Sequence, residues 1–213
     1  MPVRKVISAL ANRDSAVAVE LPPPRLAGGK PLEECLRTRR SCRMFADAPV
    51  ELEQVSQLLW AAQGVTGLGG LRTAPSAGAV YPYRLYVVAM NVTGLRSGVY
   101  AYDPDRHVLS LRKAGELRPE LERGVCDQDE VENSALGILL STTYTRSRLE
   151  FGEKGVRLAH IEAGHIAQNV MLEAGSLGLG VIGLARIDEA AMRRALELRQ
   201  AEEPVYLLLA GPK

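Results

Sequence analysis

The sequence predicts an α+β domain, because its helical and strand-like patterns follow one another in an uneven order. Two helical patterns come first. Six short apolar runs that are typical of strands follow at unequal spacing, interrupted by two further helical patterns. A regular βαβ repeat would show an even alternation instead. The length of 213 residues suits one such domain with a short appendage, since domains commonly hold roughly 100 to 200 residues.

The composition is that of an ordinary globular domain. Hydrophobic residues make up 46% of the chain and charged residues 24%, and 26 Lys and Arg nearly balance 25 Asp and Glu. At a formal net charge of +1, no overall field draws the chain to nucleic acid or to an acidic membrane. The three cysteines lack C-x-x-C spacing, and no apolar run reaches the roughly 18 residues of a membrane span. We therefore expect a cytoplasmic protein without nucleic-acid or membrane partners.

The first third of the chain predicts an arm followed by two helices. Residues 1–31 end in L-P-P-P and G-G-K-P, which remove backbone donors and helix preference, so we expect an N-terminal arm there and a compact domain over 32–213. A short helix is expected over 32–40, where early acidic residues and late arginines complement the helix dipole. Apolar residues at helical period predict a second helix over 50–63, ended by Gly64.

The middle of the chain predicts a binding loop and three strands. Residues 64–79 hold five glycines and one proline, and a loop of that length in a compact domain is usually functional or mobile. The β-branched run over 84–91 predicts a buried strand. Residues 99–102 and 108–111 flank the turn sequence D-P-D-R and predict a hairpin.

The last third predicts one long helix among strands. Apolar residues over 136–143 indicate another buried strand. Residues 155–178 form the longest helical pattern, and it is apolar on more than one side, so part of it is expected to pack against another subunit. A short strand over 181–184, a helix from a cap at Asp188 through 199, and a final strand over 205–210 complete the prediction.

A basic cluster forms the first candidate binding site. Arg39, Arg40, Ser41 and Arg43 place three guanidinium groups and a hydroxyl within five residues. Such a group suits a phosphate ester, because guanidinium stays charged and binds oxyanions with paired hydrogen bonds. In a nearly neutral chain this local concentration favours anion binding. The alternative is a solvated basic turn.

A small-residue loop forms the second candidate site. A-P-S-A-G-A at 74–79, with Pro75, Ser76, Ala77 and Gly78 at its centre, lets backbone groups come close to a flat ligand. The alternative is a plain turn before the strand at 84–91.

Two further patterns match ligand motifs without the context that those motifs need. G-L-G-V-I-G at 178–183 matches the dinucleotide fingerprint, but that fingerprint lies between a strand and a helix, the reverse of the order expected here. Glu162 and His165 have the i, i+3 spacing of carboxylate-bridged metal sites, yet no second such pair occurs. We expect helix packing or a hydrogen bond to a ligand there, and no metal site.

Taken in order, six segments resemble the nitroreductase-like flavoprotein family, and more narrowly its SagB-type dehydrogenase branch. The segments are R-R-S-C-R-M-F (39–45), P-S-A-G-A-V-Y-P (75–82), G-V-Y-A-Y-D-P-D-R-H-V-L (98–109), G-E-K-G-V-R (152–157), E-A-G-H-I-A-Q-N (162–169) and L-G-L-G (177–180). The resemblance runs from residue 32 to the end of the chain. It implies a nitroreductase-like fold, with a central, mainly antiparallel sheet flanked by helices, in an intertwined homodimer that holds FMN at its interface.

The resemblance also implies roles for particular residues. The basic cluster would hold the phosphate and ribityl end of FMN, with Arg43 reaching toward the ring. The small-residue loop of the partner subunit would line the ring, and residues after the G-x-G-x-x-G segment would cover its other side near N5. The implied cofactor-binding residues are Arg39, Arg40, Ser41, Arg43, Pro75, Ser76, Ala77, Gly78, Gly183, Leu184 and Ala185. In some classical nitroreductases a basic C-terminal extension reaches the FMN phosphate, and in this chain only Lys213 could do so.

The expected function is that of an FMN-dependent oxidoreductase, which transfers hydride through flavin N5 and reduces a small nitro, quinone or enone acceptor with electrons from NAD(P)H. One alternative is a SagB-type dehydrogenase that oxidises azolines to azoles in modified peptides. Related azoline dehydrogenases carry a Lys-Tyr pair where this chain has Glu150 and Phe151, and that loss of an amine and a phenol argues against azoline oxidation. The other alternative is a non-catalytic, flavin-binding regulatory protein. The charged segment 114–133 is expected to shape the substrate pocket.

Overall fold

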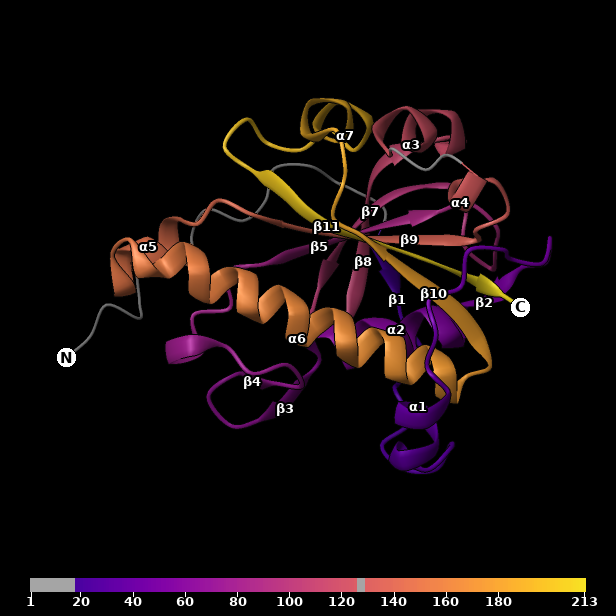
Figure 1. The fold of residues 1–213 in the computed structure, drawn as a ribbon, viewed down its shortest axis with the longest axis horizontal. Helices are drawn as coiled ribbons and strands as arrows, with labels where there is room; N and C mark the ends of the chain where they lie inside the picture. The colour runs from indigo at the N-terminus through magenta and orange to yellow at the C-terminus, as the bar shows by residue number, and fades with distance from the viewer. Residues whose placement is uncertain (1–17, 126–128) are drawn as a thin grey trace.

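The computed structural model describes residues 18–125 and 129–213, and it confirms an α+β fold with an antiparallel sheet (Figure 1). Within these residues seven strands form the main sheet, and each neighbouring pair is antiparallel. In sheet order they are β1 (Ala18–Glu20), β8 (Val108–Ala114), β7 (Gly98–Asp103), β5 (Arg84–Ala89), β9 (Leu136–Thr142), β11 (Glu203–Pro212) and β10 (Leu179–Leu184).

Helices cover both faces of this sheet. The long α6 (Lys154–Ser176) crosses one face beside α2 (Leu52–Gln63), while α3 (Arg118–Gly124) and α7 (Glu189–Ala195) pack together on the other (Figure 1). The short α1 (Leu32–Thr38) lies along α6. Two further helices, α4 (Asp129–Glu132) and α5 (Thr145–Phe151), flank β9 in the chain. No helix in the described part of the chain is long and apolar enough to cross a membrane.

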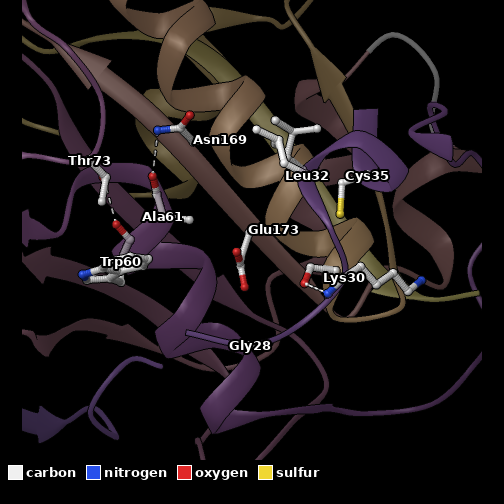
Figure 2. Close-up of a pocket in the computed structure, with 11 residues that line it drawn as sticks. Gly28, Lys30, Leu32, Cys35, Trp60, Ala61, Thr73, Asn169 and Glu173 are labelled. Atoms are coloured by element: carbon white, nitrogen blue, oxygen red, sulfur yellow. Dashed lines mark hydrogen bonds between the residues drawn. The ribbon is translucent and has the colours of Figure 1, made fainter. Parts of the chain in front are cut away.

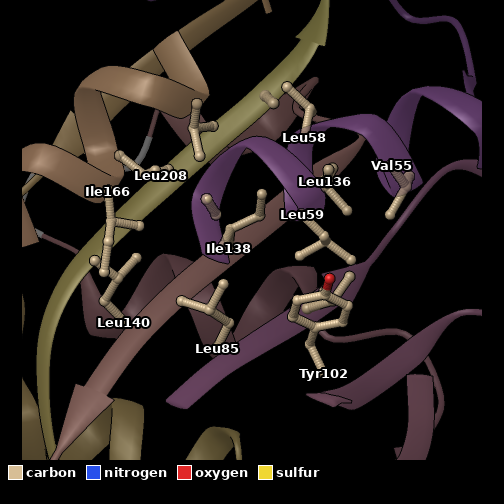
Figure 3. Close-up of a cluster of buried hydrophobic side chains, with 14 of the residues drawn as sticks. Val55, Leu58, Leu59, Leu85, Tyr102, Leu136, Ile138, Leu140, Ile166 and Leu208 are labelled. Atoms are coloured by element: carbon tan, nitrogen blue, oxygen red, sulfur yellow. The ribbon is translucent and has the colours of Figure 1, made fainter. Parts of the chain in front are cut away.

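The central strands are buried on both faces of the sheet, and this explains why their sequences are continuously apolar. Leu85, Ile138, Leu140 and Leu208 face α2 and α6 in one core cluster (Figure 3). Their neighbours along the same strands point the other way, because side chains alternate across a strand. Those neighbours pack under α3 and α7, where they include Tyr86, Leu139, Leu207 and Leu209.

Three predicted helix boundaries are wrong, although the helices themselves are confirmed. The helix expected over 32–40 ends at Thr38, and the one expected through 199 ends at Ala195. The helix expected from residue 50 begins at Leu52, because Val50 and Glu51 instead form β2, which pairs with β6 (Val92–Thr93). The predicted cap at Asp188 is confirmed, since its carboxylate accepts a hydrogen bond from the Ala191 backbone N–H at 2.9 Å.

Several short elements were not predicted. The loop expected over 64–79 contains a small hairpin of β3 (Val65–Gly67) and β4 (Leu71–Arg72), followed by the short 3₁₀ helix η2 (Ala77–Ala79). The helices α3 and α5 were also missed. β1 lies in the predicted arm and pairs with β8, so the sheet extends into residues that we expected to precede the domain. The earlier part of the arm, residues 1–17, lies outside the described residues.

Candidate functional site

A small, strongly basic cavity lies where α1, α6, β10 and the C-terminal end meet. Its volume is about 130 Å³. Four of its lining side chains are cationic and one is a carboxylate, so the cavity is suited to a multiply charged anion. It is lined by Lys30, Glu34, Thr38, Arg39, Arg40, Met171, Gly175, Leu179, Val181 and Lys213.

The end of α1 positions the predicted basic cluster at this cavity. The Arg40 guanidinium donates hydrogen bonds to the backbone carbonyls of Arg37 at 3.3 Å and Arg39 at 2.8 Å. These contacts satisfy backbone carbonyls that the end of α1 leaves without a helical partner. The chain then runs beside β10, where Ser41 pairs with Val181. Arg39, Arg40 and Ser41 are thereby brought together.

The C-terminal residue reaches the same cavity because of strand register. β11 pairs with β10 so that Pro212 lies opposite Leu179, and this pairing places Lys213 beside Arg39 and Arg40. This placement agrees with the expectation that Lys213 is the C-terminal residue that could reach a bound phosphate. Lys30 also lines the cavity, and sequence analysis missed it because it lies in a glycine- and proline-rich segment without a pattern of its own. Arg43 is exposed and is not among the lining residues.

The third predicted group, Gly183 to Ala185, continues along β10 from this cavity. Gly183 follows Val181 by two residues, so the two lie on one face of the strand about 7 Å apart. A side chain at Gly183 would collide with the Tyr206 hydroxyl and would lie 3.0 Å from Met171 Cε. Leu184 is buried on the opposite face, and Ala185 is exposed just beyond the strand. The backbone at Gly183 is therefore held close to its neighbours.

The glycines of G-L-G-V-I-G serve the helix end and the strand. Gly178 follows α6 with a φ of +79°, which favours glycine, and Gly180 and Gly183 lie within β10. The interpretation that these glycines end a helix is confirmed, because α6 precedes them and a strand contains them. This order is the reverse of that in a dinucleotide-binding unit.

The small-residue loop packs on the N-terminal half of α6. Ser76 Oγ donates a hydrogen bond to Glu162 Oε2 at 2.5 Å and accepts one from the Tyr81 backbone N–H at 2.9 Å. Gly78, two residues further along the loop, has a φ of +59°, and a Cβ built on it would lie 2.9 Å from the Phe151 ring. Ala79 and Tyr81 also have φ near +50°, although neither is glycine. Backbone strain of this kind is common at functional sites.

Within one chain, this loop and the basic cavity occupy different places on α6. The loop contacts Glu162, whereas the cavity includes Met171 and Gly175. Nine residues separate Glu162 from Met171, which is about 14 Å along a helix. A single chain therefore brings together the basic cluster and Gly183, and leaves Pro75 to Gly78 apart from them.

A buried carboxylate anchors the loop. Glu162 is 3% exposed, and burial raises its pKa to about 7, against the opposing effects of the Ser76 hydrogen bond and the Arg72 charge. Burial also raises the pKa of the Tyr83 hydroxyl, and the Glu162 charge adds to that rise. The pairing of Ser76 with Glu162 joins residues that are 86 positions apart, and no local pattern marks it.

The raised pKa of Glu162 predicts how stability depends on pH. The neutral carboxyl is favoured in the folded chain, so its contribution is fully present below the ordinary value of 4.5 and is lost as pH rises through about 7. The free energy of unfolding should therefore decrease between these values by on the order of 2 kcal/mol more in the wild type than in Glu162→Gln. Denaturant unfolding at a series of pH values measures this difference, and parallel curves for the two proteins would contradict it.

A second cavity, of about 310 Å³, adjoins the basic one between α1, α2 and α6 (Figure 2). Lys30 lines both cavities. Glu173 points into this second cavity, and burial raises its pKa. The walls are held by hydrogen bonds from Asn169 Nδ2 to the Ala61 carbonyl and from Thr73 Oγ1 to the Trp60 carbonyl. The remaining lining residues are Gly28, Leu32, Cys35, Leu172 and Ser176.

Comparison with known proteins identifies the family. The model of the Nitroreductase family matches residues 36–211. The chain belongs to the nitroreductase family. A protein of Methanocaldococcus jannaschii that carries a provisional nitroreductase name is 37% identical over 182 residues, which is 85% of this chain and 91% of that protein. The chain is accordingly an oxidoreductase, and the resemblance seen in the sequence is confirmed at the level of the family.

Solved structures agree with this assignment. A provisionally named nitroreductase of Ralstonia eutropha is 32% identical, has a TM-score of 0.80, and is matched over 92% of this chain and 89% of its own. A chain of the E. coli microcin synthetase McbBCD complex is 19% identical, with a TM-score of 0.70 over 100% of this chain and 77% of its own. NADPH:FMN oxidoreductase of Vibrio harveyi is 20% identical and has a TM-score of 0.60. The match covers 85% of this chain and 68% of that one. At 19% and 20% identity, the last two comparisons show similarity of the fold alone.

In this nitroreductase-family chain, Phe151 of the Glu150 and Phe151 pair lies beside the small-residue loop. It ends α5, and the Phe151 ring packs over Gly78. His160 and His165 of α6 each make a hydrogen bond within the chain, to the Tyr144 hydroxyl at 2.7 Å and to the Pro75 carbonyl at 3.4 Å. Among the described residues no group of three or more His, Cys, Asp or Glu could hold a metal ion.

Proposed function

We propose that this nitroreductase-family oxidoreductase binds FMN and transfers hydride from NAD(P)H to a small nitro, quinone or enone acceptor. The basic cavity carries this proposal. A phosphate ester has about two negative charges at neutral pH, and four cationic side chains around a cavity of about 130 Å³ fit such a group. FMN, when bound, supplies the hydride chemistry, and the chain supplies binding, orientation and charge.

The proposed roles follow the placement of each group. Arg39, Arg40 and Lys213 would hold the phosphate, with Ser41 beside them on β10. The backbone of Gly183, Leu184 and Ala185 would cover the ring, because this segment continues along β10 from the Val181 wall of the basic cavity. The role proposed for Arg43 is contact with the ring edge, since it lies two residues beyond Ser41 and outside the phosphate cavity. No side chain of this set is proposed as a catalytic acid or base.

We also propose a homodimer in which the second copy supplies Pro75, Ser76, Ala77 and Gly78 to the ring. The separation of this loop from the basic cavity supports the proposal, since one chain does not complete the site. Exposed apolar side chains support it further. Leu32 and Leu36 of α1 are 58% and 53% exposed, and Ile161 of α6 is 46% exposed. Apolar residues on helices that flank the cavity are typical of surfaces that pack against another chain.

The chief alternative is a SagB-type azoline dehydrogenase acting on modified peptides. The likeness in fold to a chain of the microcin synthetase complex favours it. The Phe151 ring over Gly78 opposes it, since neither Phe151 nor its neighbour Glu150 offers the amine or phenol of related azoline dehydrogenases. A non-catalytic flavin-binding regulator is the third candidate.

We propose that the protein works in a reducing cytoplasm. The two described cysteines, Cys35 and Cys42, are unpaired and agree with this location.

An absorption spectrum of the purified protein tests the proposal. We expect a flavin spectrum, release of FMN on heating at about one per chain by mass, and loss of the oxidised spectrum on adding NADH or NADPH without oxygen. A protein that neither contains FMN nor takes it up would contradict the proposal. A bound flavin that neither nicotinamide reduces would favour the regulatory alternative. Oxidation of azoline peptides only together with a partner protein would favour the SagB-type alternative.

A further inference from the structure

A polar cluster with unmet hydrogen bonds lies beneath the small-residue loop. Four buried side-chain atoms in the described part of the chain have no hydrogen-bond partner, and their residues are linked to one another. Arg72 Nη1 donates to Gln63 Oε1 at 2.9 Å, the Arg72 charge acts on Glu162, and the Glu162 charge acts on Tyr83. The four atoms are Gln63 Nε2, Arg72 Nε, Tyr83 Oη and Glu162 Oε1.

Such a cluster is costly for the folded state. Buried polar groups in proteins are nearly always hydrogen-bonded, because an unpaired one loses its interaction with water and gains nothing in return. One of the four unpaired atoms is an oxygen of the Glu162 carboxylate itself, and the backbone of the loop above it is strained at Ala79 and Tyr81. Features of this kind are retained where a group must change its bonding state during function.

The direction in which the Ser76 hydroxyl donates its hydrogen bond depends on the protonation state of Glu162. A serine hydroxyl has one proton to donate and two lone pairs to accept with. One lone pair accepts from the Tyr81 backbone N–H at 2.9 Å. While Glu162 is ionised, the single proton of Ser76 must point inward to its carboxylate, 2.5 Å away. When Glu162 is protonated, it can donate to the second lone pair, and the Ser76 proton is then available to a ligand on the loop.

The groups around Glu162 allow both states to occur near neutral pH. Burial favours the neutral carboxyl, whereas Arg72 of β4 and the Ser76 hydrogen bond favour the carboxylate. Tyr83, just before β5, contributes a neutral hydroxyl, since burial raises its pKa and the charges of Tyr144 and Glu162 raise it further. His165, one turn along α6, is held at the Pro75 carbonyl. Because these influences oppose one another, both the protonated and the ionised form of Glu162 are populated near pH 7.

We propose that Glu162 and Ser76 form a proton-transfer pair, in which Glu162 stores a proton and Ser76 delivers one to the acceptor bound at the small-residue loop. This inference rests on the proposed flavin chemistry, since the hydride supplied by NAD(P)H through FMN reduces the acceptor and one proton must accompany it. The Ser76 proton passes to the acceptor, and the Glu162 proton moves to Ser76 Oγ. Glu162 is left as a carboxylate and takes up a proton from solvent. Ser76 is the catalytic residue and Glu162 acts through it.

Infrared spectroscopy of the purified protein, with whatever cofactor it holds, tests the proton store directly. The difference between wild type and Glu162→Gln should contain a protonated carboxyl band at pH 6 that disappears as pH rises through about 7. Absence of that band at pH 6 would overturn the inference. Because this readout concerns the carboxyl itself, it tests the proton store separately from flavin binding. A protein that shows the band but neither holds nor takes up FMN would contradict the proposed function and the delivery step, and would leave the stored proton as the only part of the inference that stands.

The FMN-loaded protein tests the delivery step. In the wild type, the flavin absorption spectrum and the rate of acceptor reduction should both change across neutral pH, as Ser76 switches from acceptor to donor. In Glu162→Gln the side-chain amide donates to Ser76 at every pH. FMN should therefore remain bound, the spectral change should vanish, and the rate should fall about 100-fold because no proton is supplied. Wild-type pH dependence and rate in a Glu162→Gln protein that holds FMN would overturn the inference.

Two further variants sharpen the comparison. Ser76→Ala removes the donor itself, so it should also abolish the spectral change, and persistence of the change would contradict the pairing. Glu53→Gln removes an exposed carboxylate from the first turn of α2, and it should behave as the wild type. A loss of pH dependence in Glu53→Gln equal to that in Glu162→Gln would show that the effect is a general one of charge and would overturn the assignment to Glu162.

Discussion

Replacing both Arg39 and Lys213 by alanine should lower the affinity for FMN by at least about 100-fold, because each side chain supplies a charge-assisted contact to a phosphate. Both line the basic cavity, and they reach it from opposite ends of the chain. The remaining Lys30 and Arg40 would keep part of the attraction. Fluorescence titration of the FMN-free protein with FMN measures the affinity directly.

Riboflavin provides the matched control for this experiment. It has the ring and the ribityl chain of FMN without the phosphate, so the double variant should bind riboflavin as the wild type does. Arg123→Ala, which removes an exposed cation of α3 on the other side of the sheet, should leave both affinities unchanged. An equal loss of affinity for FMN and riboflavin in the double variant would contradict the assignment of this cavity to the phosphate.

Two variants that each fail to bind FMN when produced alone should bind FMN when they are produced together in one cell. The first is Arg39→Ala with Lys213→Ala, which lacks the basic cavity. The second is Gly78→Val, which forces a branched side chain into a residue with φ of +59° and against the Phe151 ring. If each site combines the cavity of one subunit with the loop of the other, mixed dimers contain one intact site, and about a quarter of all sites should bind FMN.

The same experiment distinguishes a site built within one chain. In that case every site in a mixed dimer carries one of the two defects, and no FMN binding should return. Each variant produced alone sets the baseline, and the fraction of mixed dimers can be measured by tagging one of the two chains. Recovery in the mixture would support the proposed homodimer, and the baseline alone would contradict it.

The sequence predicted the elements that have a strong local pattern. Helical period identified α2 and α6, the turn sequence D-P-D-R identified the hairpin of β7 and β8, and apolar runs identified β5 and β9. Elements without such a pattern were missed. β1 is a three-residue edge strand whose pairing with β8 determines it, and the hairpin of β3 and β4 interrupts a glycine-rich segment. For these, long-range contacts outweigh local preference.

The candidate site divides in the same way. The basic cluster at the end of α1 was recognisable because its residues are neighbours in the chain, and so were the glycines before and within β10. Lys30 was missed, because its glycine- and proline-rich segment has no pattern of its own. Lys213 was suggested only by the family resemblance, since the register of β11 against β10 is what brings it to the cavity beside Arg39. Ser76 and Glu162 are likewise paired by the packing of a loop on α6.

By itself, the sequence determined the fold class and the chemical character of two short candidate binding segments, because periodicity, turn chemistry and local charge are carried by residues close together in the chain. It also indicated the family, through the resemblance of six segments that the family comparison confirms. The tertiary structure alone decided which distant residues meet. It placed Lys213 beside Arg39, it separated the small-residue loop from the basic cavity, and it buried Glu162 under Ser76. The physical reason is that strand register and helix packing bring distant residues together, and burial then changes the protonation of a carboxyl that would be ionised in water.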